Sequence, residues 1–180
     1  MRRVSVVGNS GSGKTTLARE IAQRLQVAHL ELDAVFHQPG WAELPVEQFR
    51  DRVGQFVDQE AWVIDGNYTA VRDLVWARAD TVVWIDLPRR VVMMRLTRRT
   101  LGRLLLRRKL WNGNRERWTN LLSRDPDRSI LAWAWTMHSS YRDRYLGATT
   151  DPGNRHLDFV VIRSDEDIAA LLSRARPPDR

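Results

Sequence analysis

The sequence contains a complete phosphate-binding loop close to its start. Residues 8–15 read Gly-Asn-Ser-Gly-Ser-Gly-Lys-Thr and satisfy every fixed position of G-x-x-x-x-G-K-[ST]. A short apolar run, Val4–Val7, precedes the loop, and apolar residues at helical spacing follow it as far as Leu25. A strand, a glycine loop and a helix in this order bind phosphate, because the loop's N–H groups and the helix dipole point at the same anion. The chain is therefore predicted to bind a nucleoside triphosphate.

Each position of the loop has a predicted role. Glycines allow the backbone to approach the phosphates closely, so that successive N–H groups can surround them. Lys14 is expected to reach the β- and γ-phosphates, and the Thr15 hydroxyl is expected to ligate a Mg²⁺ that bridges them. The predicted phosphate-binding residues are Gly8, Asn9, Ser10, Gly11, Ser12, Gly13, Lys14, Thr15 and Thr16.

Apolar runs recur along the chain, with helical patterns between most of them. The runs predicted to form buried strands cover residues 4–7, 28–32, 62–64, 81–85 and 159–162. This alternation predicts an α/β fold with a parallel sheet and helices on both faces. A chain of 180 residues suits a single α/β domain, so the long stretch between the fourth and fifth strands is interpreted as an insert.

The insert is rich in arginine. Arg95, Arg99, Arg103 and Arg107 are spaced to share one face of a predicted helix, and residues 87–115 contain no acidic side chain. Three interpretations remain open at this stage. The arginines can form a solvated face, they can belong to a lid that closes over a triphosphate, or they can bind nucleic acid beside Trp111 and Trp118.

Two aspartates follow predicted strands, at the edge where parallel sheets bind ligands. Asp33 follows the second apolar run, and Asp65 follows the third. One is suited to hold Mg²⁺ through water, and the other to orient or deprotonate an acceptor hydroxyl. The alternative is that each is an ordinary helix cap or loop residue, and for Asp86, after the fourth run, a helix-cap role is favoured.

Composition excludes several classes of protein. The chain has no cysteine, so it has neither disulfides nor thiolate sites. No stretch approaches the ~20 apolar residues of a membrane helix. Few residues precede the glycine loop, which leaves no space for a signal peptide. We therefore expect a cytoplasmic protein without membrane partners.

The chain resembles the adenylate-kinase-like nucleotide kinases. The glycine loop, Asp65-Gly66, the run at 79–88 and the arginine-rich helix carry this likeness. The sequence is most similar to a small bacterial group labelled DNA topology modulation proteins, on the phrases at 32–36, 39–41 and 62–68.

The resemblance implies a P-loop NTPase fold with five parallel strands in the order 2-3-1-4-5. It implies a single domain spanning 1–180, with a core of 1–88 and 156–180, an acceptor-binding segment at about 34–60, and a helical lid at about 95–147. In those kinases Asp-Gly-Phe-Pro-Arg ends strand three, whereas here Asn67-Tyr68 replaces Phe-Pro. Arg72 is expected to supply the missing cation.

The implied activity is Mg²⁺-dependent transfer of the γ-phosphoryl group of ATP to a small acceptor, with a nucleotide among the candidates. Thr15 and Asp65 are the predicted metal-binding pair. The predicted catalytic residues are Lys14, Asp33, Asp65, Arg72, Arg95 and Arg99. The alternative function is a nucleic-acid-associated regulatory NTPase that modulates DNA topology.

Overall fold

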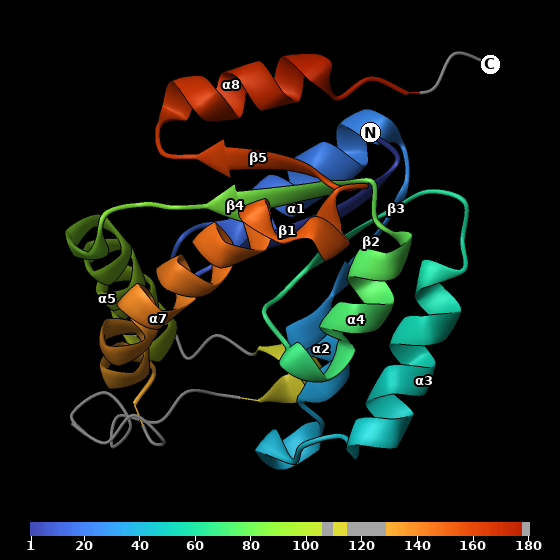
Figure 1. The fold of residues 1–180 in the computed structure, drawn as a ribbon. Helices are drawn as coiled ribbons and strands as arrows, with labels where there is room; N and C mark the ends of the chain where they lie inside the picture. The colour runs from blue at the N-terminus through green and yellow to red at the C-terminus, as the bar shows by residue number, and fades with distance from the viewer. Residues whose placement is uncertain (106–109, 115–128, 178–180) are drawn as a thin grey trace.

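The computed structural model describes residues 1–105, 110–114 and 129–177. Its strands are β1 (Arg3–Gly8), β2 (Ala28–Glu31), β3 (Trp62–Asp65), β4 (Thr81–Ile85) and β5 (Asp158–Ile162). All pairings are parallel, and the sheet order is β2-β3-β1-β4-β5. The predicted α/β architecture and strand order are confirmed (Figure 1).

Helices connect the strands. They are α1 (Lys14–Leu25), α2 (Leu32–Phe36), α3 (Val46–Val57), α4 (Thr69–Arg78), α5 (Arg89–Leu105), α7 (Ile130–Thr150) and α8 (Asp165–Arg174). Three short 3-10 turns are η1 (Pro39–Trp41), η2 (Trp111–Gly113) and η3 (Pro152–Asn154). Among the described residues, no helix is both long enough and apolar enough to cross a bilayer.

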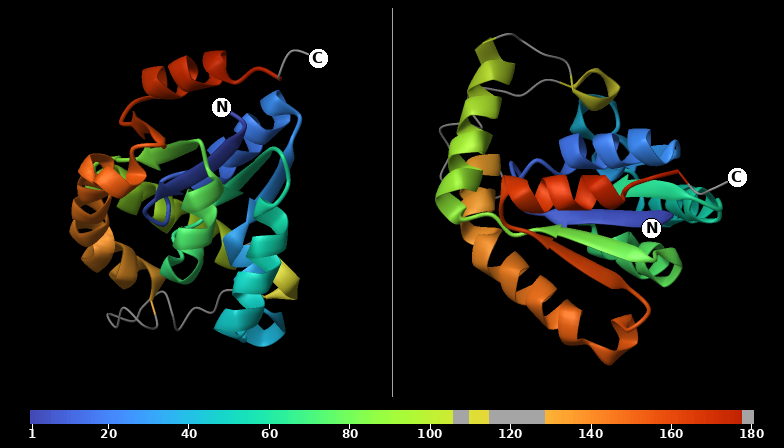
Figure 2. Two further views of the ribbon diagram at one scale, coloured as in Figure 1. Left: turned by 45° about the vertical axis from the view of Figure 1, so that its right-hand side comes forward. Right: turned by 90° about the horizontal axis from the view of Figure 1, so that it is seen from above.

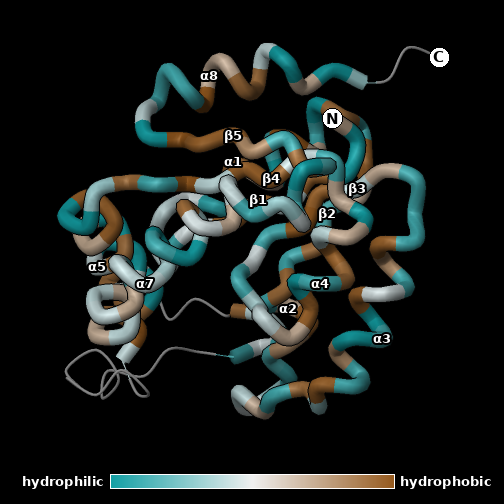
Figure 3. The backbone as a smooth tube through the Cα atoms, viewed as in Figure 1, coloured by the Kyte–Doolittle hydropathy of each residue, from teal (hydrophilic) through white to brown (hydrophobic). Residues whose placement is uncertain are grey.

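Alternate residues of each central strand enter two different cores. On one face, Val4 and Val6 of β1 pack with Ile21 of α1 and Leu171 of α8. On the other face, strand residues pack against α3, α4 and α7, and Trp62 is completely buried there. The Trp62 indole N–H donates to the Val57 carbonyl at 3.2 Å, so this large side chain is buried without an unsatisfied donor. Hydrophobic residues accordingly make up most of β5 in Figure 3.

The second strand ends one residue earlier than predicted. Leu32 was expected to lie in the strand, but it begins α2. The reason is that β2 lies at the edge of the described sheet and pairs with β3, and their register stops at the Glu31–Asp65 pair. Leu32 instead packs on Gly66, where an added Cβ would lie 2.8 Å from the Leu32 Cβ. Asp33 is thereby placed in the first turn of α2.

The described residues between β4 and β5 contain α5, η2, α7 and η3. In Figures 1 and 2, α5 stands at the end toward which the strands point, and α7 runs from that end back along the sheet toward the start of β5. Helix α7 continues to Thr150, beyond the predicted end of the lid at residue 147. Arg107 and Trp118, which the sequence analysis singled out, lie outside the described residues.

Candidate functional site

The glycine loop joins β1 to α1 and takes the backbone conformation that the sequence predicts. Gly8, Gly11 and Gly13 have φ values of 144°, 83° and 99°, which other residues rarely adopt. Two of these glycines are also packed tightly. A Cβ on Gly8 would lie 2.8 Å from the Ile85 carbonyl oxygen, and a Cβ on Gly11 would lie 2.7 Å from the Leu96 Cβ of α5. The loop is therefore fixed against β4 on one side and against the insert on the other.

Side chains also hold the loop in place. The Asn9 amide donates to the Ala134 carbonyl of α7 at 2.9 Å, which ties the loop to the second helix of the insert. The Lys14 ammonium donates to the Asn9 carbonyl at 3.2 Å. Burial lowers the pKa of Lys14, although the carboxylates of Asp33 and Asp65 act in the opposite direction. A desolvated ammonium at this place is stabilised when an anion binds beside it.

The Thr15 hydroxyl meets two carboxylates at the carboxyl ends of β2 and β3. It donates to Asp65 Oδ2 at 2.6 Å and lies 3.4 Å from Glu31 Oε1. The other carboxylate oxygen of Asp65, Oδ1, lies 2.7 Å from His29 Nε2. Burial and the nearby charge of Asp65 raise the pKa of Glu31. The structure thus brings the predicted metal-binding pair, Thr15 and Asp65, into direct contact.

The oxygen donors at this point suit Mg²⁺. Hydroxyl and carboxylate oxygens are the hard ligands that this ion prefers, and it is usually held by one or two of them together with nucleotide phosphates. In the part of the chain that the structure describes, no cluster of three or more His, Asp or Glu side chains forms an all-protein metal site. The residues therefore fit a Mg²⁺ carried in with a nucleotide.

Asp33 lies next to this group and is paired with Tyr68. The Tyr68 hydroxyl donates to Asp33 Oδ1 at 2.7 Å and lies 3.4 Å from His37 Nε2. Burial, reinforced by the charge of Asp33, raises the pKa of the Tyr68 hydroxyl far above its usual range. The phenol therefore remains protonated and acts as a donor that orients the Asp33 carboxylate.

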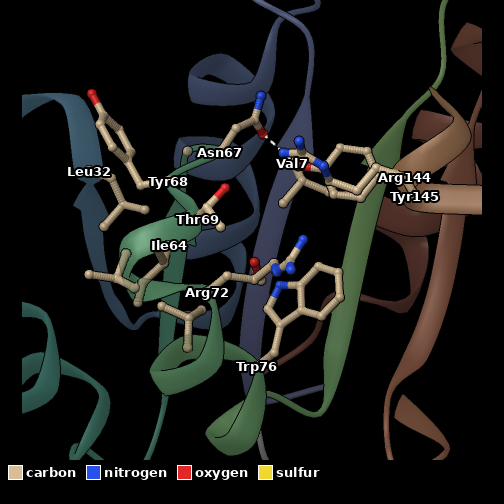
Figure 4. A pocket seen from close by; sticks show the side chains of 14 residues that line it. Val7, Leu32, Ile64, Asn67, Tyr68, Thr69, Arg72, Trp76, Arg144 and Tyr145 are labelled. Carbon is tan, nitrogen blue, oxygen red and sulfur yellow. Dashed lines mark hydrogen bonds between the residues drawn. The ribbon is translucent and has the colours of Figure 1, made fainter. Parts of the chain in front are cut away.

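Asn67 connects the end of β3 to the first residue of the glycine loop. Its Oδ1 accepts from the Gly8 N–H at 3.1 Å, and its Nδ2 donates to the Gly8 carbonyl at 2.6 Å. The Tyr145 hydroxyl of α7 donates to the same Oδ1 at 3.0 Å (Figure 4). The departure from the kinase phrase at this position therefore has a structural role, because the Asn67 amide orders the loop.

The predicted arginines divide between two places. Arg95, Arg99 and Arg103 of α5 line a cleft of about 1620 Å³ that also contains the glycine loop, and Arg99 donates to the Ser10 hydroxyl at 3.3 Å. This position favours a role with phosphates over a solvated face. Arg72 instead lies beside Trp76, with its guanidinium carbon 5.5 Å from the ring centroid, in a separate cavity of about 20 Å³ (Figure 4).

Several residues of the site were not predicted from the sequence. His29, Glu31, Asn67 and Tyr68 were not predicted as functional residues, yet each contacts a residue that was. One signal was available for the first two. His29 and Glu31 alternate with Leu30, so they share one face of a strand that precedes an aspartate.

The tight packing of Gly11 leads to a stability prediction. Gly11→Ala is expected to lower the free energy of unfolding by about 1–3 kcal/mol, because the new methyl group meets Leu96 at a positive φ. Urea denaturation followed by circular dichroism measures this change. Gly54→Ala is the matched control, since that helical glycine has open space around its Cβ position and is expected to gain about 0.5–1 kcal/mol. Equal stability of Gly11→Ala and the parent protein would contradict the packing argument.

A five-stranded parallel sheet in this order, with a glycine loop leading into its first helix, defines the P-loop class of α/β proteins. The solved structures of a gluconokinase from Sinorhizobium meliloti and a shikimate kinase from Bacteroides thetaiotaomicron share this fold. Their TM-scores are 0.52 and 0.54, each is 17% identical to this chain, and each comparison covers 96% of this chain and 92% or 95% of the other.

The sequence comparisons match a smaller part of the chain. No family model matches the chain. A segment of 53 residues is 38% identical to cytidylate kinase of Chlamydia trachomatis, which corresponds to 26% of this chain and 24% of that enzyme. The chain therefore matches about a quarter of the length of this curated relative.

Proposed function

We propose that the chain is a Mg²⁺-dependent phosphotransferase that moves the γ-phosphoryl group of ATP to a hydroxyl group of a small acceptor. The observation that carries the proposal is the 2.6 Å contact between the Thr15 hydroxyl and Asp65, beside a cleft that Thr15 and Asp33 both line. A hydroxyl that is hydrogen-bonded to a carboxylate can ligate a metal ion bound to a nucleotide. A second carboxylate nearby, that of Asp33, can accept a proton from the acceptor.

The donor half of the cleft supplies position and charge. The backbone of residues 8–15 surrounds the phosphates, and the Lys14 ammonium neutralises them. Mg²⁺, held by Thr15 with Asp65 behind it, would neutralise charge on the β- and γ-phosphates. Arg95 and Arg99 reach the same cleft from α5 and are placed to stabilise the group in transfer.

The acceptor half of the cleft supplies the base. Asp33 is held by the Tyr68 hydroxyl, which leaves its second carboxylate oxygen, Oδ2, available to accept the proton of an incoming hydroxyl. The predicted acceptor-binding segment contributes His37, Trp41 and Glu43 to the lining of this half. The likeness to adenylate-kinase-like enzymes and the partial match to a cytidylate kinase support a nucleotide donor, and a cytoplasmic setting would provide ATP.

Phosphorus-31 NMR tests this function directly. The protein is incubated with Mg·ATP and a panel of nucleosides, nucleoside monophosphates, sugars and amino alcohols. A new phosphoester signal that grows with ADP and requires Mg²⁺ is the expected result. Inorganic phosphate as the sole product across a broad panel would indicate an NTPase, and would favour the regulatory function that the group of DNA topology modulation proteins suggests.

A further inference from the structure

Three aromatic rings gather at the acceptor end of the cleft. The His37 ring lies 5.3 Å from the Trp41 ring, edge to face, and 6.0 Å from the Trp111 ring, nearly parallel to it. The two tryptophan rings are 6.5 Å apart and almost perpendicular. All three residues line the cleft, although Trp111 comes from the insert and the other two follow β2.

One residue of this aromatic group, Trp41, has a strained backbone conformation. Trp41 has a φ of 64°, a left-handed conformation that bulky residues rarely adopt. Asn114, which is 5% exposed, holds it there by accepting from the Trp41 N–H at 3.0 Å and donating to the Gln38 carbonyl at 2.9 Å. Strain that a distant segment maintains in a cleft is characteristic of ligand-binding residues.

The same end of the cleft carries negative charge. Glu31, Asp33 and Glu43 line it, and Glu43 is bridged to His37 through the backbone. Between residues 34 and 60, all of which the structure describes, no lysine or arginine lines the cleft. Arg50, the first basic residue after Glu43 in the sequence, pairs with Asp73 at 2.8 Å. Arg19, on α1, is paired with Glu31 at 3.1 Å.

Carboxylates beside aromatic faces attract cations and repel phosphates. Cations bind over the faces of tryptophan rings, and Trp111 already has the Arg103 guanidinium 6.0 Å from its ring centroid. The phosphate of a nucleoside monophosphate would instead meet Asp33 and Glu43 without a cation from the acceptor segment, since the third carboxylate, Glu31, is paired with Arg19.

We infer that the acceptor is an alcohol that carries a protonated amine and no phosphate group, with its amine held between Trp41, Trp111 and Glu43 and its hydroxyl directed to Asp33. This inference rests on the proposed phosphotransferase function and names its substrate class. In the transfer, the acceptor oxygen forms a bond to the γ-phosphorus, the bond from that phosphorus to the ADP oxygen breaks, and Asp33 takes the hydroxyl proton.

Calorimetric binding to the protein with Mg²⁺ and a non-hydrolysable ATP analogue tests the inference. The probes form matched sets: glucosamine, glucose and glucose 6-phosphate, and separately adenosine and AMP. We expect glucosamine to bind about ten-fold more tightly than glucose, and each phosphate ester to bind about ten-fold more weakly than its parent. Equal or tighter binding of the phosphate esters would overturn the inference, and so would a lack of binding by glucosamine.

A charge variant shows whether the carboxylates cause the preference. Glu43→Gln is expected to reduce the preference for glucosamine over glucose several-fold, while Glu47→Gln, an exposed position outside the cleft lining, should leave it unchanged. An unchanged preference in Glu43→Gln would contradict the proposed role of Glu43. Phosphoryl transfer to a nucleoside monophosphate in the NMR assay would support the proposed function and overturn this inference. Selective binding of glucosamine without any use of ATP would overturn the proposed function, and it would leave glucosamine as a ligand of the cleft and not as a phosphoryl acceptor.

Discussion

Lys14→Ala is expected to lower kcat/KM for ATP about 10³-fold while the protein stays folded. The ammonium lies in the glycine loop, where it donates to the Asn9 carbonyl at 3.2 Å, and it is the half-buried cation best placed to neutralise the phosphates. Removing one preorganised donor from an active site costs on the order of 10²–10³ in rate, and a full charge is at the upper end of that range. Steady-state phosphoryl transfer, followed as ADP production, measures the loss.

The same substitution has an informative effect on stability. Because burial lowers the pKa of Lys14 in the folded protein, the unfolded chain holds this proton more tightly than the folded chain does. The charged ammonium therefore lowers the free energy of unfolding at neutral pH. This destabilisation decreases as the pH rises toward 10.5, the ordinary pKa of a lysine. Lys14→Ala should thus have a Tm equal to or above that of the parent at neutral pH, with the difference shrinking at alkaline pH.

Arg24→Ala provides the control for Lys14→Ala. Arg24 lies on the same helix, is exposed and pairs with Glu20 at 3.2 Å, and Arg24 itself does not line the cleft. Its replacement should leave turnover within about two-fold of the parent, because exposed ion pairs contribute little. Full turnover in a folded Lys14→Ala protein would refute the proposed mechanism.

Asp65→Asn is expected to lower kcat about 10²-fold and to raise the Mg²⁺ concentration needed for half-maximal rate. The amide keeps the size of the side chain, but it removes the negative charge that accepts from Thr15 at 2.6 Å and faces His29 at 2.7 Å. A metal held through Thr15 loses the carboxylate behind it, and such outer partners typically affect affinity or activity 10- to 100-fold. A Mg²⁺ titration of the initial rate measures both effects.

Asp86→Asn is the matched control for Asp65→Asn. Asp86 follows the neighbouring strand β4 and is also buried, but its carboxylate pairs with Arg142 and Arg163, each at 3.3 Å. Its replacement should lower stability slightly, since both arginines are more than half exposed and water can solvate them once the carboxylate is gone, and it should leave the Mg²⁺ requirement unchanged. An identical shift in the Mg²⁺ requirement for both variants would argue against a special role for Asp65.

The fold could be predicted largely from the sequence, because the signals that determine it are local. Apolar runs mark every strand except β2, where polar and apolar residues alternate, and the glycine loop fixes how β1 leads into α1. Resemblance to a kinase family supplied the strand order, which is now confirmed. The boundary at Leu32 was missed because it depends on where the partner strand β3 ends, and the residues of β2 alone contain no such information.

The site could be predicted only in part, because its contacts join residues far apart in the chain. Asp65 and Thr15 were each identified from position, but their 2.6 Å contact requires the register of β1 with β3. Arg72 was predicted from its place after a motif, yet one face of α4 turns it toward Trp76. The grouping of Trp41 with Trp111 depends on how the insert folds back, which no local pattern reports.

The Asn67 amide has a consequence for nucleotide affinity. A loop that is disordered before binding loses conformational entropy when the ligand orders it, and that loss weakens the complex. Here both polar atoms of one side chain already fix the Gly8 backbone, at 3.1 Å and 2.6 Å, before any phosphate arrives. The start of the loop therefore loses its conformational entropy during folding and not during nucleotide binding. The free energy of the phosphate contacts is then not reduced by that loss, and the nucleotide binds more tightly.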